Sequence, residues 1–225
     1  TPGMFLGADG KPQRLRDAIP GGLSVGVPGA LAMLAKAHAE HGKLPWAKLF
    51  EPAINLASGG FKVPPRLGAE INGFLKNTDM PDVKAAFFHP DGTPFAEGET
   101  MRNAALADTF RAIAKGGPDV FYKGPIAQAI VDAVAKAPKQ KGGMTRQDLA
   151  SYQPKVRPGL CAPYRGYRVF ECPPNGQGIT ALIALNILEG LDLAELEALS
   201  VEKMHLMIEA MRLAFADSRW YVADP

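Results

Sequence analysis

Residues Gly21–Phe61 read GGLSVGVPGALAMLAKAHAEHGKLPWAKLFEPAINLASGGF, and the glycines and prolines of this stretch divide it into helices. Pro28 suits the first position of a helix, where its fixed φ angle fits and its missing N–H is not needed. Apolar residues then recur at helical spacing until Gly42 ends the run. A second helix begins at Pro45, and Pro52 inside it predicts a bend or a division. The stretch therefore predicts a fold dominated by helices.

Further helices are predicted between this stretch and residue 152. Their apolar spacing and terminal residues place them at residues 64–76, 103–115, 125–137 and 145–152. Asn103 is a suitable N-cap, and Thr145 with Asp148 has the spacing of a capping box. The predicted buried stripe of the helix after Asn103 consists of Leu106, Phe110 and Ile113. Residues 77–101 are rich in proline and turn dipeptides, and we expect little regular structure there.

The pattern changes to that of β-strands after residue 152. Lys155–Arg157, Leu160–Pro163 and Tyr167–Cys172 have strand composition, and the residues between the last two predict a hairpin turn. The hairpin places Cys161 and Cys172 on adjacent strands. Cross-strand cysteine pairs only occasionally have disulfide geometry, so we predict that both thiols are free.

A glycine-rich turn, PPNGQG at residues 173–178, joins the last predicted strand to a helix over residues 179–189. Such a turn exposes backbone N–H groups at the positive end of a helix, which suits an anion or a carboxylate. The candidate substrate-binding residues are therefore Asn175, Gly176, Gln177 and Gly178. Glycines here are equally explained by a tight turn and by close packing, and both interpretations stay open.

The last predicted helix begins at Ser200 and carries Met204, Ile208, Met211 and Phe215 on one face. Methionines at this spacing are typical of a protein core rather than of a cofactor site. Taken together, the patterns predict an α+β fold class that is predominantly helical with a small β hairpin. The expected order is helical over residues 28–152, strand-rich over 154–173 and helical over 179–223.

The composition excludes several classes of function. Of the 225 residues, 47% are hydrophobic and 21% are charged, and the formal net charge is +2, which is typical of a folded globular chain. Its 25 basic and 23 acidic residues are interspersed, so we expect no nucleic-acid partner. No apolar run reaches the roughly 20 residues that cross a bilayer, so we expect no membrane association.

No group of residues forms a convincing catalytic or metal-binding motif. His38 and His41 lie three residues apart on one predicted helix, but no third ligand accompanies them, so we predict neither a metal nor another cofactor. The acidic pairs are Glu97 with Glu99 and Glu195 with Glu197. Alternate acidic positions in polar loops are typical of solvated surface rather than of an acid and base pair. We therefore assign no catalytic residue.

Several ordered segments resemble the large subunit of the γ-glutamyltransferase family, which consists of autoprocessed N-terminal-nucleophile (Ntn) hydrolases and transferases. They are SVGVPG with HGKLPWAKLFEPAINLASGGF, then GGMTRQDLASYQP, YRGYRVFECPPNGQGI and EAMRLAFADSRWYVADP. The resemblance covers nearly the whole chain, which we interpret as a single large-subunit segment over residues 1–225. It implies an αββα sandwich in the complete molecule, with the hairpin near Tyr167 joining or bordering the central sheet.

The resemblance also implies a partner and a reaction. Family members act through a threonine that becomes the first residue of a small subunit after self-cleavage, and a Gly-rich oxyanion loop follows it; this sequence matches neither. We therefore expect the small catalytic subunit of the same precursor as partner and a small-molecule γ-glutamyl or related amide as substrate. The arginine that binds the substrate carboxylate lies before the matching segment in the family.

Thr1 does not fit the role of nucleophile, because Pro2 constrains the backbone where an oxyanion-binding N–H is commonly needed. The residues that follow Thr1 also resemble the middle of the family's large subunit rather than the start of its small one. We expect this segment to be inactive alone. An uncovered strand edge and apolar face should make it self-associate or take up a partner.

The turn at residues 173–178 departs from the Pro-Pro-Pro-Ser-Ser-Gly-Gly form that is usual in γ-glutamyltransferases proper. Its Asn-Gly-Gln-Gly sequence looks more like a divergent branch that includes oxamate-type amidohydrolases and acylases, whose substrate is a different small amide. A non-catalytic helical binding or scaffold module is a further alternative. A γ-glutamyltransferase proper would be periplasmic or secreted and an amidohydrolase-like protein cytoplasmic, so the compartment stays open.

Overall fold

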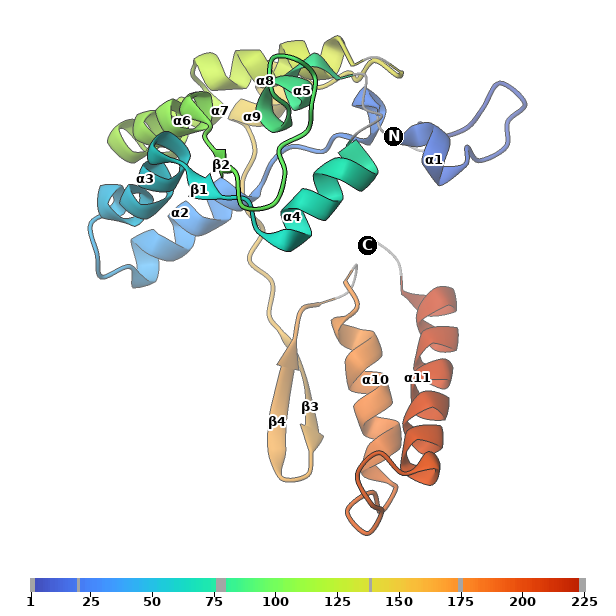
Figure 1. The fold of residues 1–225 in the computed structure, drawn as a ribbon. Coiled ribbons are helices and arrows are strands. Elements are labelled where there is room, and N and C mark those ends of the chain that lie inside the picture. The colour runs from blue at the N-terminus through green and yellow to red at the C-terminus, as the bar shows by residue number, and fades with distance from the viewer. Residues whose placement is uncertain (1–2, 20, 76–79, 138, 174–175, 223–225) are drawn as a thin grey trace. The chain divides into compact units, whose positions relative to one another are not determined.

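The computed structural model describes residues 3–19, 21–75, 80–137, 139–173 and 176–222. The chain divides into two compact units, residues 1–154 (unit 1) and residues 155–225 (unit 2). Unit 1 is helical with one short sheet, whereas unit 2 consists of a hairpin and two helices (Figure 1, orange to red). The fold is therefore mostly helical, as the sequence predicted, and it has two small antiparallel sheets where one hairpin was expected.

Unit 1 contains nine α-helices and one two-stranded sheet among its described residues. The helices are α1 (Leu15–Ala18), α2 (Ala30–His41), α3 (Glu51–Gly59), α4 (Pro65–Glu70), α5 (Pro81–Phe87), α6 (Ala104–Gly116), α7 (Pro118–Tyr122), α8 (Pro125–Ala135) and α9 (Arg146–Ala150). The strands β1 (Phe61–Lys62) and β2 (Thr100–Met101) pair antiparallel, which the sequence did not predict.

The two helices predicted for residues 21–61 are present, with a shift at one start. α2 begins at Ala30, so Pro28 precedes the N-cap residue Gly29 rather than standing at the first helical position. The second helix is divided as Pro52 predicted, because a 3-10 turn over Trp46–Phe50 precedes α3. The indole N–H of Trp46 donates to the Ile113 carbonyl oxygen at 3.2 Å, which attaches this stretch to α6.

Local capping signals in unit 1 are confirmed. The Asn103 side chain accepts a hydrogen bond from the backbone N–H of Leu106 at 2.9 Å, and α6 follows it. Thr145 and Asp148 form the predicted capping box at the start of α9. The predicted stripe of α6 is only partly buried, because Ile113 is 4% exposed and Leu106 is 41% exposed. Ala107, with no exposed surface, takes the central position instead.

Three predictions in the helical and strand segments need correction. Residues 81–87 form α5, where irregular structure was expected, because Pro81 stands in the first turn and Asp82 complements the positive helix end. The helix predicted for residues 64–76 is α4 followed by a π-helical turn, Ile71–Leu75, and Lys76 lies outside the described residues. Lys155–Arg157 forms no strand, since the flanking prolines lack the N–H that a ladder requires.

The core of unit 1 is centred on Tyr122, Ala127 and Leu149, which come from α7, α8 and α9. The hydroxyl of Tyr122 donates to the Pro28 carbonyl oxygen at 2.5 Å and accepts from the Ala32 N–H at 3.1 Å. The first of these bonds joins residues 94 positions apart. The buried hydroxyl of Tyr122 thus attaches the start of α2 to α7, in addition to the apolar contacts of this core.

Unit 2 begins with the predicted hairpin. Strands β3 (Leu160–Tyr164) and β4 (Tyr167–Glu171) pair in register from Leu160 opposite Glu171 to Tyr164 opposite Tyr167. Arg165 (φ 48°) and Gly166 (φ 81°) both have positive φ, as a type I′ turn requires. The backbone N–H of Arg165 donates to the Glu189 carboxylate at 2.9 and 3.1 Å, which attaches the turn to a helix end. Cys161 and Cys172 are free, as predicted.

Helices α10 (Gly178–Glu189) and α11 (Val201–Tyr221) complete unit 2 and pack against each other. Ser200 caps α11 by accepting from the Lys203 N–H at 3.2 Å, as its position predicted. The prediction that the methionine face of α11 is core is wrong for this chain. Met204, Ile208 and Met211 are 39%, 50% and 50% exposed, and the buried residues of α11 are Ala210 and Ala214.

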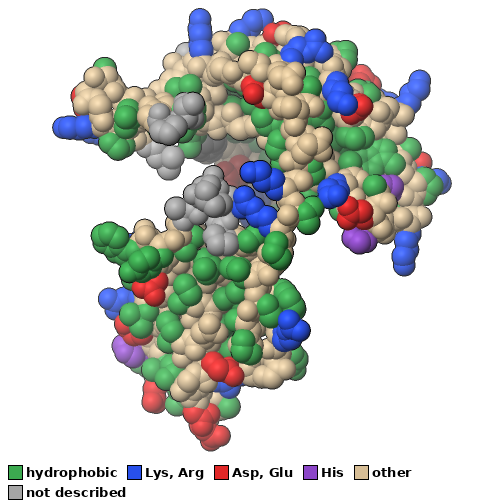
Figure 2. Space-filling view, turned by 180° about the vertical axis from the view of Figure 1, so that it is seen from behind, with side chains coloured by type: hydrophobic (Ala, Val, Ile, Leu, Met, Phe, Trp, Pro, Cys, Tyr) green, Lys and Arg blue, Asp and Glu red, His purple; other side chains and the backbone are tan. Residues whose placement is uncertain are grey.

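Figure 2 shows many hydrophobic side chains at the surface of unit 2. The apolar face of α11, consisting of Met204, Ile208, Met211 and half-buried Phe215, contributes to this exposed surface. Tyr167 and Phe170 on β4 are 76% and 62% exposed. None of the described helices is both long and apolar enough to span a bilayer.

Candidate functional site

The glycine-rich turn connects the end of strand β4 to the start of helix α10. Gly176, Gln177 and Gly178 are described, whereas Pro174 and the predicted site residue Asn175 lie outside the described residues. Gln177 is the N-cap residue, but its side chain makes no capping hydrogen bond. The N–H groups of the first turn of α10 therefore face the turn without a side-chain cap.

Gly178 is needed for close packing. A Cβ at this position would stand 2.8 Å from the Cys172 carbonyl oxygen and 2.8 Å from the Glu171 Cβ. Real Cβ atoms do not approach backbone so closely, so the start of α10 can lie against the end of β4 only with glycine there. The packing interpretation of this glycine therefore has a direct geometric basis.

The turn borders a cavity of about 350 Å³ between α10 and α11. Gln177 and Gly178 line it together with Glu171 at the end of β4 and Thr180 in the first turn of α10. Its remaining lining is apolar and includes Met211 and Phe215 from the apolar face of α11. The cavity thus combines one carboxylate, one amide and one hydroxyl with an apolar wall.

The hydroxyl of Thr180 is already used in holding the two helices together. Ser218 donates its hydroxyl proton to the Ala214 carbonyl oxygen at 2.7 Å. Its oxygen lies 2.5 Å from the Thr180 hydroxyl, so Thr180 must be the donor of that bond. Thr180 is therefore a fixed, acceptor-capable group at the cavity and has no base within this chain of bonds to activate it.

Glu171 and Thr180 were not singled out from the sequence. Thr180 follows Gln177 by three residues, so helical geometry could have placed both at the first turn. Glu171 reaches the same cavity only because β4 lies against α10, which is tertiary structure. The carboxylate of Glu171 also counts against a second anion in the cavity, because like charges in a partly enclosed site repel.

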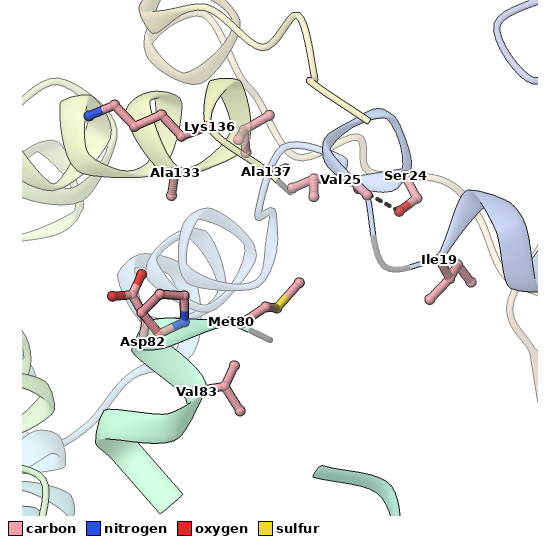
Figure 3. A pocket seen from close by; sticks show the side chains of 12 residues that line it. Ile19, Ser24, Val25, Met80, Asp82, Val83, Ala133, Lys136 and Ala137 are labelled. Atoms are coloured by element: carbon pink, nitrogen blue, oxygen red, sulfur yellow. Dashed lines mark hydrogen bonds between the residues drawn. The ribbon is translucent and has the colours of Figure 1, made fainter. Parts of the chain in front are cut away.

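A second cavity, of about 640 Å³, lies in unit 1 and is lined mainly by apolar side chains (Figure 3). In Figure 3, Met80 and Val83 of the α5 region face Val25, with Ile19 across the opening. Among the described lining residues only Ser24 carries a hydroxyl, which donates to the Gly21 carbonyl oxygen at 2.8 Å. This cavity can enclose an apolar group, but its described lining holds no nucleophile with a base.

Local contacts involve His38, His41 and one member of an acidic pair, Glu99. The Nε2 of His38 lies 2.8 Å from the Leu44 carbonyl oxygen. This nitrogen must therefore carry a proton, and it cannot itself bind a metal. His41 is on the surface, and its Nε2 lies 3.8 Å from a carboxylate oxygen of Glu40. The pKa of Glu99 is lowered, first by the hydrogen bond from the Ala96 N–H and then by His89.

Within the described ranges, no three His, Cys, Asp or Glu side chains lie close enough to hold a metal ion. Thr1 is outside the described residues, so the structure says nothing of its position. The described residues therefore line a cavity at the turn but assemble no catalytic group. What the chain does must be sought in its relatives.

Comparison with known proteins identifies similar sequences and structures. The family model described as gamma-glutamyltranspeptidase matches residues 1–225. The "Glutathione hydrolase proenzyme" of Bacillus subtilis is 34% identical over 226 residues, covering 100% of this chain and 38% of the relative. The "Acylase ACY 1 proenzyme" of Pseudomonas is 36% identical over 214 residues, covering 94% of this chain and 38% of the relative.

Solved structures of the same family also match this chain. The crystal structure of Helicobacter pylori gamma-glutamyltranspeptidase matches with a TM-score of 0.89 and 31% identity, covering 100% of this chain and 64% of that chain. The chain spans 38% of the length of the curated relatives named above. The similarity therefore concerns one part of the relatives, and it extends over nearly all of the present sequence.

Proposed function

The chain belongs to the gamma-glutamyltranspeptidase family, and we propose that it is a large-subunit part of an enzyme that transfers or hydrolyses a γ-glutamyl or related acyl group. The family match over residues 1–225 is the observation that carries this proposal. The relatives are named as proenzymes of glutathione hydrolases and acylases, and the family's structures are Ntn hydrolases. The chemistry is then acyl transfer.

In the proposed mechanism, the hydroxyl of an N-terminal threonine on a small subunit attacks the amide carbonyl. Its own α-amine takes the hydroxyl proton, and backbone N–H groups stabilise the oxyanion. The amine of the substrate leaves with a proton, and the acyl-enzyme passes its acyl group to water or to an amine acceptor. The present chain supplies support and one wall of the cleft, and it is inactive alone.

Mass spectrometry of the purified gene product, with parallel assays of γ-glutamyl-anilide and oxamate hydrolysis, tests this proposal. We expect a second, threonine-initiated polypeptide and turnover of one of the two substrates. Turnover of oxamate alone would favour the amidohydrolase branch, and the acylase relative at 36% identity supports testing other small amides too. A single 24.0 kDa species without turnover would refute the enzyme and favour a scaffold module.

We propose that the turn at residues 175–178 contributes to the substrate-side wall of this enzyme. Gln177 lines the cavity beside α10, and its side chain is not used as a helix cap. In the assembled enzyme, Gln177→Ala should raise KM several-fold with little change in kcat, because an interaction with bound substrate is lost. Gln147→Ala, on the surface of α9, is the matched control. Equal KM values for both variants would rule the turn out.

We propose that the partner subunit covers exposed apolar surface of this chain. The chain exposes 15614 Å² in all. Two separate compact monomers of the sizes of unit 1 and unit 2 would together expose only about 12,000 Å². The excess is on the order of 4,000 Å² on this chain alone, and a partner that covered it would form an interface in the large, obligate class. The apolar face of α11 is the part of this surface where we expect contact.

Without that partner, the isolated chain should self-associate. Size-exclusion chromatography with light scattering should give a mass above 24.0 kDa, and a hydrophobic dye should bind. Replacing Ile208 and Met211 by aspartate should reduce both signals, whereas Glu202→Gln, at the exposed start of α11, should not. A monomer that binds no dye would contradict the proposed interface.

A further inference from the structure

A groove of about 700 Å³ lies on unit 1 between α5 and β2, apart from both cavities described above. It is formed by the end of α5, by the loop that joins α5 to β2 in Figure 1, and by Arg102 directly after β2. A volume of this size falls within the range of small-molecule sites in proteins, about 300–1,000 Å³. Its lining brings together side chains of two kinds, cationic and aromatic.

The loop that forms the groove is held in one conformation by its own hydrogen bonds. Phe88 and Pro94 form an antiparallel bridge, and the His89 N–H donates to the Thr93 carbonyl oxygen at 2.8 Å. The carboxylate of Asp91 accepts from the N–H and the hydroxyl of Thr93 at 2.9 and 2.6 Å. The rim of the groove is therefore preorganised, which lowers the entropy cost of binding.

Aromatic rings form one wall. The His89 ring lies against the Phe95 ring with centroids 4.1 Å apart and an angle of 45° between the planes. Phe88 is half-buried beside them and lines the same groove. Flat, partly exposed rings of this kind can stack with an aromatic group of a ligand.

The cationic side chains are Lys84 and Arg102. The Nε of Arg102 donates to the Gly59 carbonyl oxygen at 3.0 Å, which fixes the guanidinium while its two terminal nitrogens bind nothing else among the described residues. Lys84 likewise has no ion pair within the described part of the chain, and it also lines the groove. A fixed guanidinium with free terminal nitrogens is suited to carboxylate or phosphate oxygens.

Glu99, three residues before Arg102, forms no ion pair with either cation. The Glu99 carboxylate accepts from the Ala96 N–H at 2.8 Å and lies 3.1 Å from Nε2 of His89. This carboxylate is therefore already engaged by His89 and by a backbone donor. Asp91 is held by Thr93, as described above. The groove keeps two cationic side chains beside an aromatic wall.

We propose that this groove binds a small organic anion that carries an aromatic ring. Its acid group pairs with Arg102 and Lys84, and its ring lies on Phe88 and Phe95. Neither the acyl-transfer chemistry nor the apolar face of α11 requires such a site, so the proposal stands independently of the proposed function. The site is exposed, so binding is weak and depends on both the charge and the ring.

The probe is phenyl phosphate, titrated into the ¹⁵N-labelled chain and followed by amide chemical shifts. Saturable shifts are expected at residues 84–102. Benzyl alcohol, which lacks the charge, and inorganic phosphate, which lacks the ring, should each bind at least about tenfold more weakly, since each loses one of the two interactions. Equal binding of all three probes, or shifts spread over the whole surface, would overturn the proposal.

Two variants assign the charge. Arg102→Gln and Lys84→Gln should each weaken phenyl phosphate binding by about three- to tenfold, as expected for loss of one partly exposed charge-assisted contact. Arg102→Gln also loses the bond to Gly59, but Lys84 has no such role among the described residues, so its variant separates binding from folding. Lys115→Gln, on the surface of α6, is the control. Unchanged affinity in both groove variants would refute the assignment.

Discussion

Replacing Tyr122 by Phe should destabilise unit 1, because it removes one hydroxyl that makes two hydrogen bonds. That hydroxyl donates to the Pro28 carbonyl oxygen at 2.5 Å and accepts from the Ala32 N–H at 3.1 Å. Ala32 lies in the first turn of α2, whose N–H groups have no partner within the helix. The N-cap residue Gly29 has no side chain to supply one. Tyr122 therefore caps α2 from another part of the chain.

The magnitude follows from the two bonds. Each contributes about 1 kcal/mol net, and a buried N–H or carbonyl left without a partner costs about 1–3 kcal/mol. Phe fills the space of the ring, and Tyr122 is 6% exposed, so no cavity and little water entry are expected. We expect Tyr122→Phe to lower the free energy of unfolding of unit 1 by about 2 kcal/mol.

Urea denaturation followed by amide hydrogen exchange at Ala32 measures this loss within unit 1, even if the two units unfold separately. Tyr152→Phe is the matched control. Its ring stacks on that of Tyr122 with centroids 6.1 Å apart, but its hydroxyl has no hydrogen-bond partner in the described part of the chain. The control should change stability by less than about 0.5 kcal/mol. Equal effects of the two variants, or no effect of Tyr122→Phe, would refute the capping argument.

Three further predictions concern pH and backbone geometry. Burial raises the pKa of Tyr122, so the folded state holds this proton more tightly than the unfolded state does. The free energy of unfolding should therefore fall as pH rises above about 10. The urea midpoint of Tyr122→Phe should lack this contribution to the decrease at alkaline pH. The Thr145 hydroxyl and then its N–H lower the pKa of Asp148, so α9 should lose protection from hydrogen exchange as pH falls below about 4, and Asp148→Asn should remove that dependence. Gly166 has a φ of 81° with no atom within 4 Å of an added Cβ. Gly166→Ala should therefore cost about 1–2 kcal/mol of backbone strain alone, and an unchanged melting temperature of unit 2 would contradict it.

Features that depend on adjacent residues were predictable from the sequence. The capping box of Thr145 and Asp148 and the Asn103 cap lie within one turn, so the residue types nearly determine the geometry. The hairpin is local for the same reason, since Arg165 and Gly166 connect its two strands directly. α5 was missed because Pro81 was interpreted as a turn residue, although proline is equally suited to the first turn of a helix.

The candidate site was only half predictable. Gln177 and Gly178 could be named because a glycine-rich turn after a strand has a recognisable pattern. Glu171 and Thr180 enter the same cavity through the contact of β4 with α10, which no spacing in the sequence specifies. The mutual approach also explains why Gly178 is required, since a Cβ there would meet Glu171 itself.

The prediction that the methionine face of α11 is buried in this chain was wrong for a physical reason, and the same reason bears on assembly with a partner. Helical periodicity shows that a helix has an apolar face, but it does not show whether the covering partner belongs to the same chain. Inside unit 2, α11 meets α10 through small residues, Ala210 and Ala214, which allow close approach. The large side chains Met204, Ile208 and Met211 stay 39%, 50% and 50% exposed. Part of the hydrophobic free energy that α11 can contribute is thus unrealised in this chain, so the stability of unit 2 should rise when a partner covers the apolar face of α11.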